Sequence, residues 1–212
     1  MKKSSSDNPN KIISLKHHFN KQRSIRNRSA ISEDDLEYFK TDRYANNISE
    51  LFYNCNRLES IPISDINVNT RYCTDMSKTF GHCYSITTLD LSNWDTANVM
   101  NMDSMFVYAD HLKIIIGLNK WNTANVTSMA NMFCGCKSLE VLDLSSWDTS
   151  NVKNMMNMFK GCSSLKQIKG IIDMKNCTNW KYMFDGCDSL AEVKLKNVPE
   201  EFTSPECARI IE

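Results

Sequence analysis

Cysteine recurs at one place in successive segments of the sequence, which makes it the first candidate for metal chemistry. The recurring residues are Cys55, Cys83, Cys136, Cys162 and Cys187. Zinc needs four ligands that converge on one point, whereas cysteines at one place in successive repeats form a line. Ala109 takes the same place in one segment, and a small buried cysteine fills tight interior space well. We therefore expect these thiols to pack in a core, and we predict no metal site.

Histidine close to cysteine would also suit nucleophilic catalysis. His82 precedes Cys83, and His111 lies farther along the chain. A thiol nucleophile needs a base within reach, a group that orients the base, and an oxyanion site. Adjacent residues usually point apart, and the sequence offers no set of groups that would converge in this way. We expect no enzymatic activity, no catalytic residue and no cofactor.

Acidic and amide side chains repeat in register, at positions suited to calcium or to turns. Asp95 and Asp148 stand in the phrases WDTAN and WDTSN, and Asn122 replaces the aspartate in a third copy. Calcium needs about six to eight oxygen ligands around each ion. Asp and Asn side chains also hydrogen-bond to the backbone of turns, and that is the simpler interpretation. We extend it to the asparagines that repeat in register, Asn98, Asn125 and Asn151.

These columns belong to an internal repeat. Phenylalanine marks each copy, and the spacings between successive markers are 28, 26, 27, 26 and 25 residues. The markers, which number repeats 1 to 6 below, are Phe52, Phe80, Phe106, Phe133, Phe159 and Phe184. An apolar residue stands six and nine places after every marker. A repeat of this kind buries its apolar face by stacking on its copies, so the columns predict one shared core.

Each repeat contains two kinds of apolar spacing, one typical of a strand and one typical of a helix. In SLEVLDL, residues 138–144, apolar residues alternate with polar ones, which predicts a short strand. In TSNVKNMMNMF, residues 149–159, the apolar spacing predicts a short helix capped by Ser150 or Asn151. The glycines expected to end these helices are Gly81, Gly135, Gly161 and Gly186. Because strands pack more closely than helices, stacking would bend the array into a right-handed curved solenoid with the strands inside.

The amino-acid sequence of the repeats resembles that of a known family. A unit of leucine, two residues, leucine, one residue and leucine, followed by a helix, resembles a leucine-rich repeat. LDLSNWDTANVMNMDSMF at 89–106 and LDLSSWDTSNVKNMMNMF at 142–159 are similar to repeats of the BspA-like leucine-rich-repeat surface proteins, a Mycoplasma-type repeat of unknown function. The resemblance covers roughly residues 51–198. It implies an α/β repeat fold, a right-handed curved leucine-rich-repeat solenoid with one short strand and one short helix per unit of about 26 residues.

Composition divides the chain into four parts. Residues 1–30 carry a net charge of +7 and the remainder carries −7, so we interpret the start as a flexible basic arm. Residues 31–50 are predicted to form a helical N-terminal cap. Residues 51–198 hold about five to six repeats, and residues 199–212 form a C-terminal cap or tail.

Compartment is predicted from the apolar segments and the cysteines. The start has no apolar stretch that would serve as a secretion signal, and no apolar run approaches the ~20 residues that cross a bilayer. Nine cysteines, an odd number, point to a reducing environment. We expect a cytoplasmic or particle-associated protein with no transmembrane segment, although members of the BspA-like family are often found at the cell surface.

Function is predicted on the concave strand face, where polar strand positions alternate with buried ones. The candidate partner-binding residues are Thr88, Asp90, Val141, Asp143, Gln167, Lys169, Glu192, Lys194 and Lys196. A rigid face whose charge changes sign along its length favours a specific protein partner, and the family resemblance implies a binding or adhesion module. The runner-up is a structural or receptor-contacting component of a phage or virus particle. Nucleic-acid binding through residues 1–30 is the weakest alternative.

Overall fold

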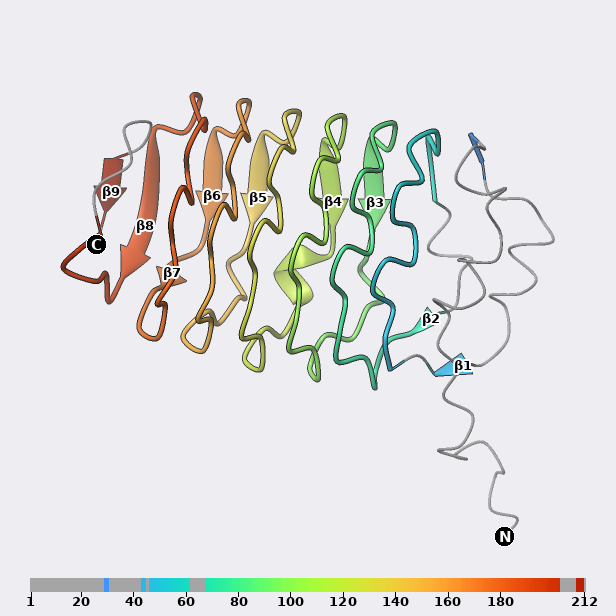
Figure 1. Ribbon diagram of the computed structural model, residues 1–212, viewed down its shortest axis with the longest axis horizontal. Coiled ribbons are helices and arrows are strands. Elements are labelled where there is room, and N and C mark those ends of the chain that lie inside the picture. The colour runs from blue at the N-terminus through green and yellow to red at the C-terminus, as the bar shows by residue number, and fades with distance from the viewer. Residues whose placement is uncertain (1–28, 31–42, 45, 62–67, 203–208, 212) are drawn as a thin grey trace, which may run out of the picture.

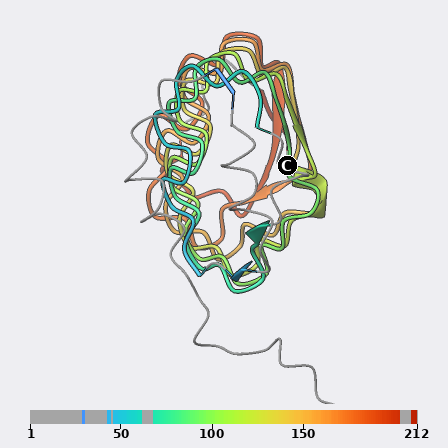
Figure 2. The same ribbon diagram turned by 90° about the vertical axis from the view of Figure 1, so that its right-hand side faces the viewer.

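Consecutive repeats lie side by side along the longest axis of the molecule. The computed structural model describes residues 29–30, 43–44, 46–61, 68–202 and 209–211. Figure 1 shows successive turns of the chain as neighbouring loops of similar outline. Viewed along the stack in Figure 2, these turns superimpose, with longer strands gathered on one side and tight turns on the other. Equivalent residues of neighbouring repeats therefore become neighbours in space.

Short parallel strands join neighbouring repeats. The pairs are β1 (Arg43–Tyr44) with β2 (Val68–Asn69), β3 (Thr88–Asp90) with β4 (Ile114–Ile116), and β5 (Val141–Asp143) with β6 (Gln167–Lys169). A three-stranded sheet contains β7 (Ile172–Asp173), β8 (Glu192–Lys196) and β9 (Arg209–Ile211), in that order. Leu89 is in register with Ile115, and Leu142 with Ile168. The strand predicted within residues 138–144 is confirmed as β5.

A second parallel ladder crosses the whole stack through single bridges. It runs through Asn47, Asp75, Asn101, Ser128, Asn154 and Asn179, one residue from each repeat. Each member stands five residues before the marker Phe of its repeat. The bridge ladder thus joins all six repeats, and the strand pairs add a second connection between repeats 2 and 3 and between repeats 4 and 5.

The fold-class prediction is wrong. The structure shows small, separate parallel sheets connected by turns, and not an α/β right-handed curved leucine-rich-repeat solenoid with a helix in each repeat. Within the described ranges the helical element is η3 (Leu118–Lys120), a single 3-10 turn. Residues 149–160, predicted as a capped helix, consist of extended backbone, turns and an isolated bridge.

Left-handed backbone explains why the helix does not form. Every marker Phe is flanked, two residues before and two residues after, by a residue of positive φ. In repeat 5 these are Asn157 at 56° and Gly161 at 71°. A right-handed helix cannot pass through such residues, and Asn and Gly are the types that tolerate them best. Gly135, Gly161 and Gly186 thus support turns rather than ending helices, and Gly81, one residue nearer its Phe, is not left-handed.

Hydrogen bonding between repeats replaces the helical ladder. The backbone N–H groups of Asn131, Phe133 and Gly135 donate to carbonyls of repeat 5 at 2.8, 2.8 and 2.7 Å. The same alternation recurs between the other neighbouring repeats. An isolated helix of about ten residues is marginal in water, whereas these bonds connect copies that already share a core.

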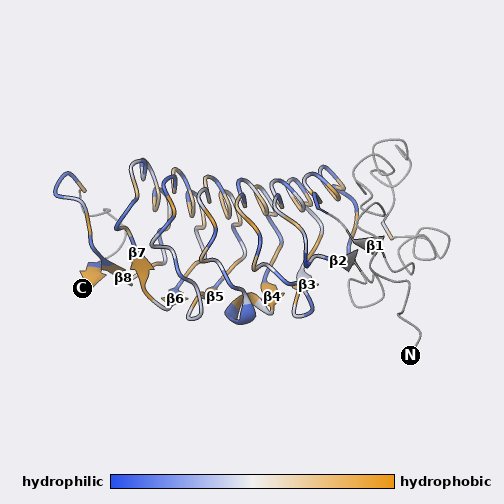
Figure 3. Ribbon diagram, turned by 90° about the horizontal axis from the view of Figure 1, so that it is seen from below, coloured by the Kyte–Doolittle hydropathy of each residue, from blue (hydrophilic) through white to orange (hydrophobic). Residues whose placement is uncertain are grey.

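The core is a set of parallel columns that run through all repeats. The rings of the six marker phenylalanines form one stack, with successive centroids 5.4–5.7 Å apart and ring planes within 8° of parallel. Leu89, Leu142 and Leu165 are buried as the repeat alignment predicts. Figure 3 shows hydrophobic and hydrophilic residues alternating along each turn, which directs one set inward. Stacking therefore supplies the core, as the columns indicated.

Several predictions for the ends fall on residues that the structure does not describe. Almost all of the arm 1–30 lies outside the described residues, and so does most of the cap 31–50. Of the segment 199–212, β9 pairs with β8, so the chain returns to the last sheet. In the described part of the chain, no helix has the length and apolar character needed to span a bilayer.

Candidate binding surfaces

All nine predicted partner-binding residues lie on β3, β5, β6 and β8, which stand in one row with β4 on one side of the stack (Figures 1 and 2). Eight of them are exposed, and Asp143 is half-buried. The leucine, isoleucine and valine between them point into the core. We call the outward side of β3, β4, β5, β6 and β8 the strand face.

Sequence reasoning missed three exposed apolar side chains in the middle of this face. Ile114 and Ile116 of β4 are 54% and 46% exposed, and Val141 of β5 is 46% exposed. From the sequence alone, the run of three isoleucines favours burial, because apolar and polar residues do not alternate within it. The register of β4 against β3 settles the orientation, since it pairs Ile114 with exposed Thr88 and Ile116 with exposed Asp90.

Two charged side chains of the strand face are held by hydrogen bonds from a neighbouring serine. The carboxylate of Asp90 accepts hydrogen bonds from the hydroxyl and the N–H of Ser92, which lower its pKa. Asp143 is held in the same way by Ser145, and hydrogen bonding to its hydroxyl is the main cause of a lowered pKa. These two aspartates therefore build turns after their strands as well as facing outward. Lysines dominate the face farther along the stack.

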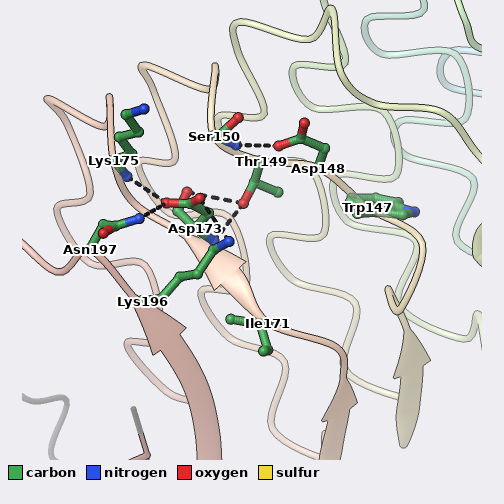
Figure 4. A pocket seen from close by; sticks show the side chains of 9 residues that line it. All are labelled: Trp147, Asp148, Thr149, Ser150, Ile171, Asp173, Lys175, Lys196 and Asn197. Atoms are coloured by element: carbon green, nitrogen blue, oxygen red, sulfur yellow. Dashed lines mark hydrogen bonds and ion pairs between the residues drawn. The ribbon is translucent and has the colours of Figure 1, made fainter.

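Lys196 borders a polar hollow of about 460 Å³ at the edge of the face. Figure 4 shows its lysine nitrogen directed at Asp173, with Asn197 on the other side of the same carboxylate. The Nζ–Oδ2 distance is 3.1 Å, and the Asn197 amide donates to Oδ1 at 2.8 Å. Lys196 is thus committed to an ion pair, which limits its use for a partner.

Asp173 is a buried carboxylate held in its charged form. Desolvation by burial would raise its pKa, but hydrogen bonds from Asn197, the Lys175 N–H and Lys196 outweigh it and lower the pKa. Its backbone N–H donates to the hydroxyl of Thr149 at 2.7 Å, and that hydroxyl donates to its carbonyl at 3.0 Å. The hollow is therefore lined by groups that already satisfy one another.

The cysteine column lies in the core. All five cysteines are buried, and burial raises the pKa of the thiols of Cys83, Cys136 and Cys162. Each of these three thiols donates to the carbonyl of the marker Phe one repeat earlier, at 3.0–3.1 Å. The prediction that they pack in the core is confirmed. Among the described residues, no three His, Cys, Asp or Glu side chains gather as metal ligands would.

The histidines lie apart from the thiols. The Nδ1 atom of His82 is 2.7 Å from the hydroxyl of Tyr84, and Nδ1 of His111 is 2.6 Å from the Tyr84 carbonyl. The thiol of Cys83 points instead to the Phe52 carbonyl. The structure therefore does not bring His82 or His111 together with Cys83 as a base and a nucleophile.

The prediction of turn hydrogen bonding is confirmed for the two aspartates, whereas the asparagines bond between repeats. The carboxylates of Asp95 and Asp148 accept from the N–H two residues later, at 3.0 and 2.9 Å. Asn98, Asn125 and Asn151 donate their amides to carbonyls of the preceding repeat at 2.7–2.9 Å. Sequence reasoning missed a matching threonine column, in which the buried hydroxyls of Thr96, Thr123 and Thr149 donate to the following repeat.

Comparison with known proteins gives one family. Two overlapping stretches, residues 13–116 and 74–197, match the family model described as "Mycoplasma protein of unknown function, DUF285". Together the two stretches span most of the chain and all six marker phenylalanines. No curated protein and no solved structure matches the chain.

Proposed function

Since the chain belongs to the DUF285 family, whose description assigns no function, we propose that it is a non-enzymatic module that binds a protein partner through its strand face. The partner would contact the exposed side chains of β3, β4, β5, β6 and β8. Similarity of the repeat sequences to those of BspA-like surface proteins supports binding or adhesion as the class of function.

The observation that carries this proposal is the exposure of Ile114 and Ile116 on β4, and of Val141 at the place equivalent to Ile114 in the next repeat. Large apolar side chains that are exposed and bordered by polar residues are typical of interaction sites. Asp90 is the register partner of Ile116, Asp143 follows Val141 on β5, and Gln167 faces Val141 across the β5–β6 register. Apolar anchors surrounded by polar groups are the arrangement that binding interfaces use.

Rigidity of the face supports the same proposal. Most exposed strand residues have a buried neighbour, such as Leu89 beside Asp90 and Leu142 beside Val141, and the β3–β4 and β5–β6 pairs each fix the spacing between two neighbouring repeats. A surface that is already ordered loses little conformational entropy on binding, which favours affinity.

Affinity capture with the full chain tests the proposal. We expect Ile114→Asp and Val141→Asp, each made singly, to abolish retention of the partners that the parent protein captures. Lys194→Glu should weaken retention and change its salt dependence, because it alters charge at the rim. Met100→Asp is the matched control, since Met100 is 51% exposed but lies outside the strand face, next to Asn101 of the single-bridge ladder.

The result is interpretable when thermal unfolding shows that all variants are folded. Retention that survives both strand-face substitutions, or that is lost equally in Met100→Asp, would overturn the proposal.

A further inference from the structure

Four aromatic side chains from repeats 1 to 3 gather on the turn side of the stack. The ring of His82 lies 5.3 Å from Tyr53, 5.7 Å from Tyr84 and 5.2 Å from Tyr108, measured between centroids. Tyr84 and Tyr108 are exposed, and His82 and Tyr53 are half-buried. We call these four residues the aromatic platform. It is separate from the strand face.

Two members of the platform occupy backbone positions that do not favour them. His82 and Tyr108 have φ values of 59° and 54°, in the left-handed region that bulky residues rarely adopt. The equivalent positions of repeats 4 to 6 are Gly135, Gly161 and Gly186, so glycine is sufficient to build this turn. Bulky residues held in such a conformation are more common at functional sites than elsewhere.

Glycines of the neighbouring repeats support the tyrosine rings. A Cβ atom on Gly135 would stand 2.4 Å from Cδ1 of Tyr108, so this ring lies directly on the glycine backbone. A Cβ atom on Gly81 would stand 3.0 Å from Cδ2 of Tyr53. One side of each ring therefore rests against the next repeat, and the platform is built into the stack.

Charges around the platform are neutralised in pairs. Lys137 pairs with Asp110 at 2.7 Å, and Lys78 lies 3.8 Å from Glu50. Desolvation lowers the pKa of His82 although the charge of Asp110 opposes it, so the imidazole is neutral at pH 7. His111 contacts the Tyr84 carbonyl, and the Cys134 thiol, whose pKa is raised by burial, is in hydrogen-bond contact with Tyr108. An uncharged ligand fits this surface best.

The packing of the rings excludes two other ligands that use aromatic residues. Single-stranded nucleic acid stacks its bases on aromatic rings but needs unpaired positive charge along its backbone, and these lysines are paired with carboxylates. Proline-rich peptides insert between aromatic side chains that form a groove. Here His82 is in edge contact with Tyr53 and Tyr84, at interplanar angles of 85° and 81°, which closes the space between them.

We propose that the aromatic platform binds an uncharged glycan chain. A pyranose ring offers a C–H face that packs on an aromatic ring and hydroxyls that reach polar groups at its edge. Tyrosine suits this use because its ring is apolar and its hydroxyl is polar. Tyr84 and Tyr108 supply exposed ring surface from neighbouring repeats, and the imidazole of His82 lies between them. The row along the stack suits successive sugar units of one chain.

Titration calorimetry with maltohexaose, cellohexaose, chitohexaose and mannohexaose tests the proposal on the full chain. At least one of these oligosaccharides should bind. His82→Asn and Tyr108→Asn should each weaken that binding about tenfold or more. Asparagine tolerates left-handed backbone and already occupies the equivalent position 54, so both variants should unfold at or above the temperature of the parent.

Tyr182→Asn is the matched control, because Tyr182 is also left-handed and exposed but belongs to repeat 6. It should bind sugar as the parent does. The proposal is overturned if none of the four oligosaccharides binds, or if Tyr108→Asn and Tyr182→Asn bind alike. Binding of an oligonucleotide or a proline-rich peptide that requires Tyr108, without sugar binding, would also overturn it.

Discussion

At the scale of single residues, polar side chains find their partners in the neighbouring repeat. The amide of Asn151 donates to the Ala124 carbonyl, and the hydroxyl of Thr149 both donates to and accepts from the backbone of Asp173. A buried polar group left without a partner costs about 1–3 kcal/mol, so each column of polar residues fixes the alignment of the repeats. Asp173 is the most demanding case, because it is charged.

Asp173 should make stability depend on acid pH. Its pKa is below the ordinary value of 3.8, so its charged form stabilises the folded state above that value. This contribution is lost as the pH falls through the lowered folded-state pKa. We expect Asp173→Asn to be less stable than the parent at neutral pH, and the difference to shrink in strong acid. Urea unfolding across this range measures it, and parallel profiles for parent and variant would contradict it.

At the scale of elements, the turn around each marker Phe is the unit that positions both surfaces. Its two left-handed residues direct backbone N–H groups to the next repeat and turn the intervening Phe inward. This backbone conformation accepts different residue types at the outward positions, since Gly161 and Tyr108 occupy equivalent places in their repeats. The turn therefore keeps the same backbone conformation in every repeat, while the side chains on its surface differ.

Two glycine substitutions separate backbone strain from ring displacement. Gly135→Ala and Gly161→Ala both place a Cβ at a left-handed residue, which costs about 1–2 kcal/mol. At Gly161 the nearest atom to that Cβ is 3.7 Å away, whereas at Gly135 it would overlap the ring of Tyr108. We expect Gly135→Ala to be the less stable variant by thermal unfolding. Equal loss in the two variants would mean that the Tyr108 ring moves at no cost.

At the scale of the whole molecule, each repeat contacts mainly its neighbours. The single-bridge ladder and the phenylalanine stack both pass from one repeat to the next without interruption. Stability of such arrays is approximately a sum of repeat and interface contributions. The length of the array is then adjustable in whole repeats.

Deletion of residues 107–133 tests whether the array can be shortened by one whole repeat. The deletion joins Phe106 to Cys134 and should bring β3 against β5 in the register that β4 has now. We expect a folded protein with a cooperative transition at lower temperature. Deletion of 107–120 is the control, because it leaves half a repeat and breaks every column, and it should not fold. Circular dichroism and calorimetry would measure both, and equal behaviour of the two deletions would contradict the prediction.

The sequence by itself determined what is buried and in which order. Columns such as Leu89, Leu142 and the marker phenylalanines follow from periodicity, because stacked copies must hide the same positions. The predicted strand-face residues also follow, since strand positions alternate. The use of Asp95 and Asp148 in turns could be predicted from their side-chain chemistry.

Only the tertiary structure decided the backbone conformation and the surfaces. The spacing of Val152, Met155 and Phe159 suits a helix and a run of turns equally, and hydrogen bonds to neighbouring repeats selected the turns. Exposure of Ile114 depends on its register with Thr88, which lies in another repeat. The aromatic platform joins three repeats in the same way. Contacts between repeats have no local signal, so they appear only when the copies are stacked.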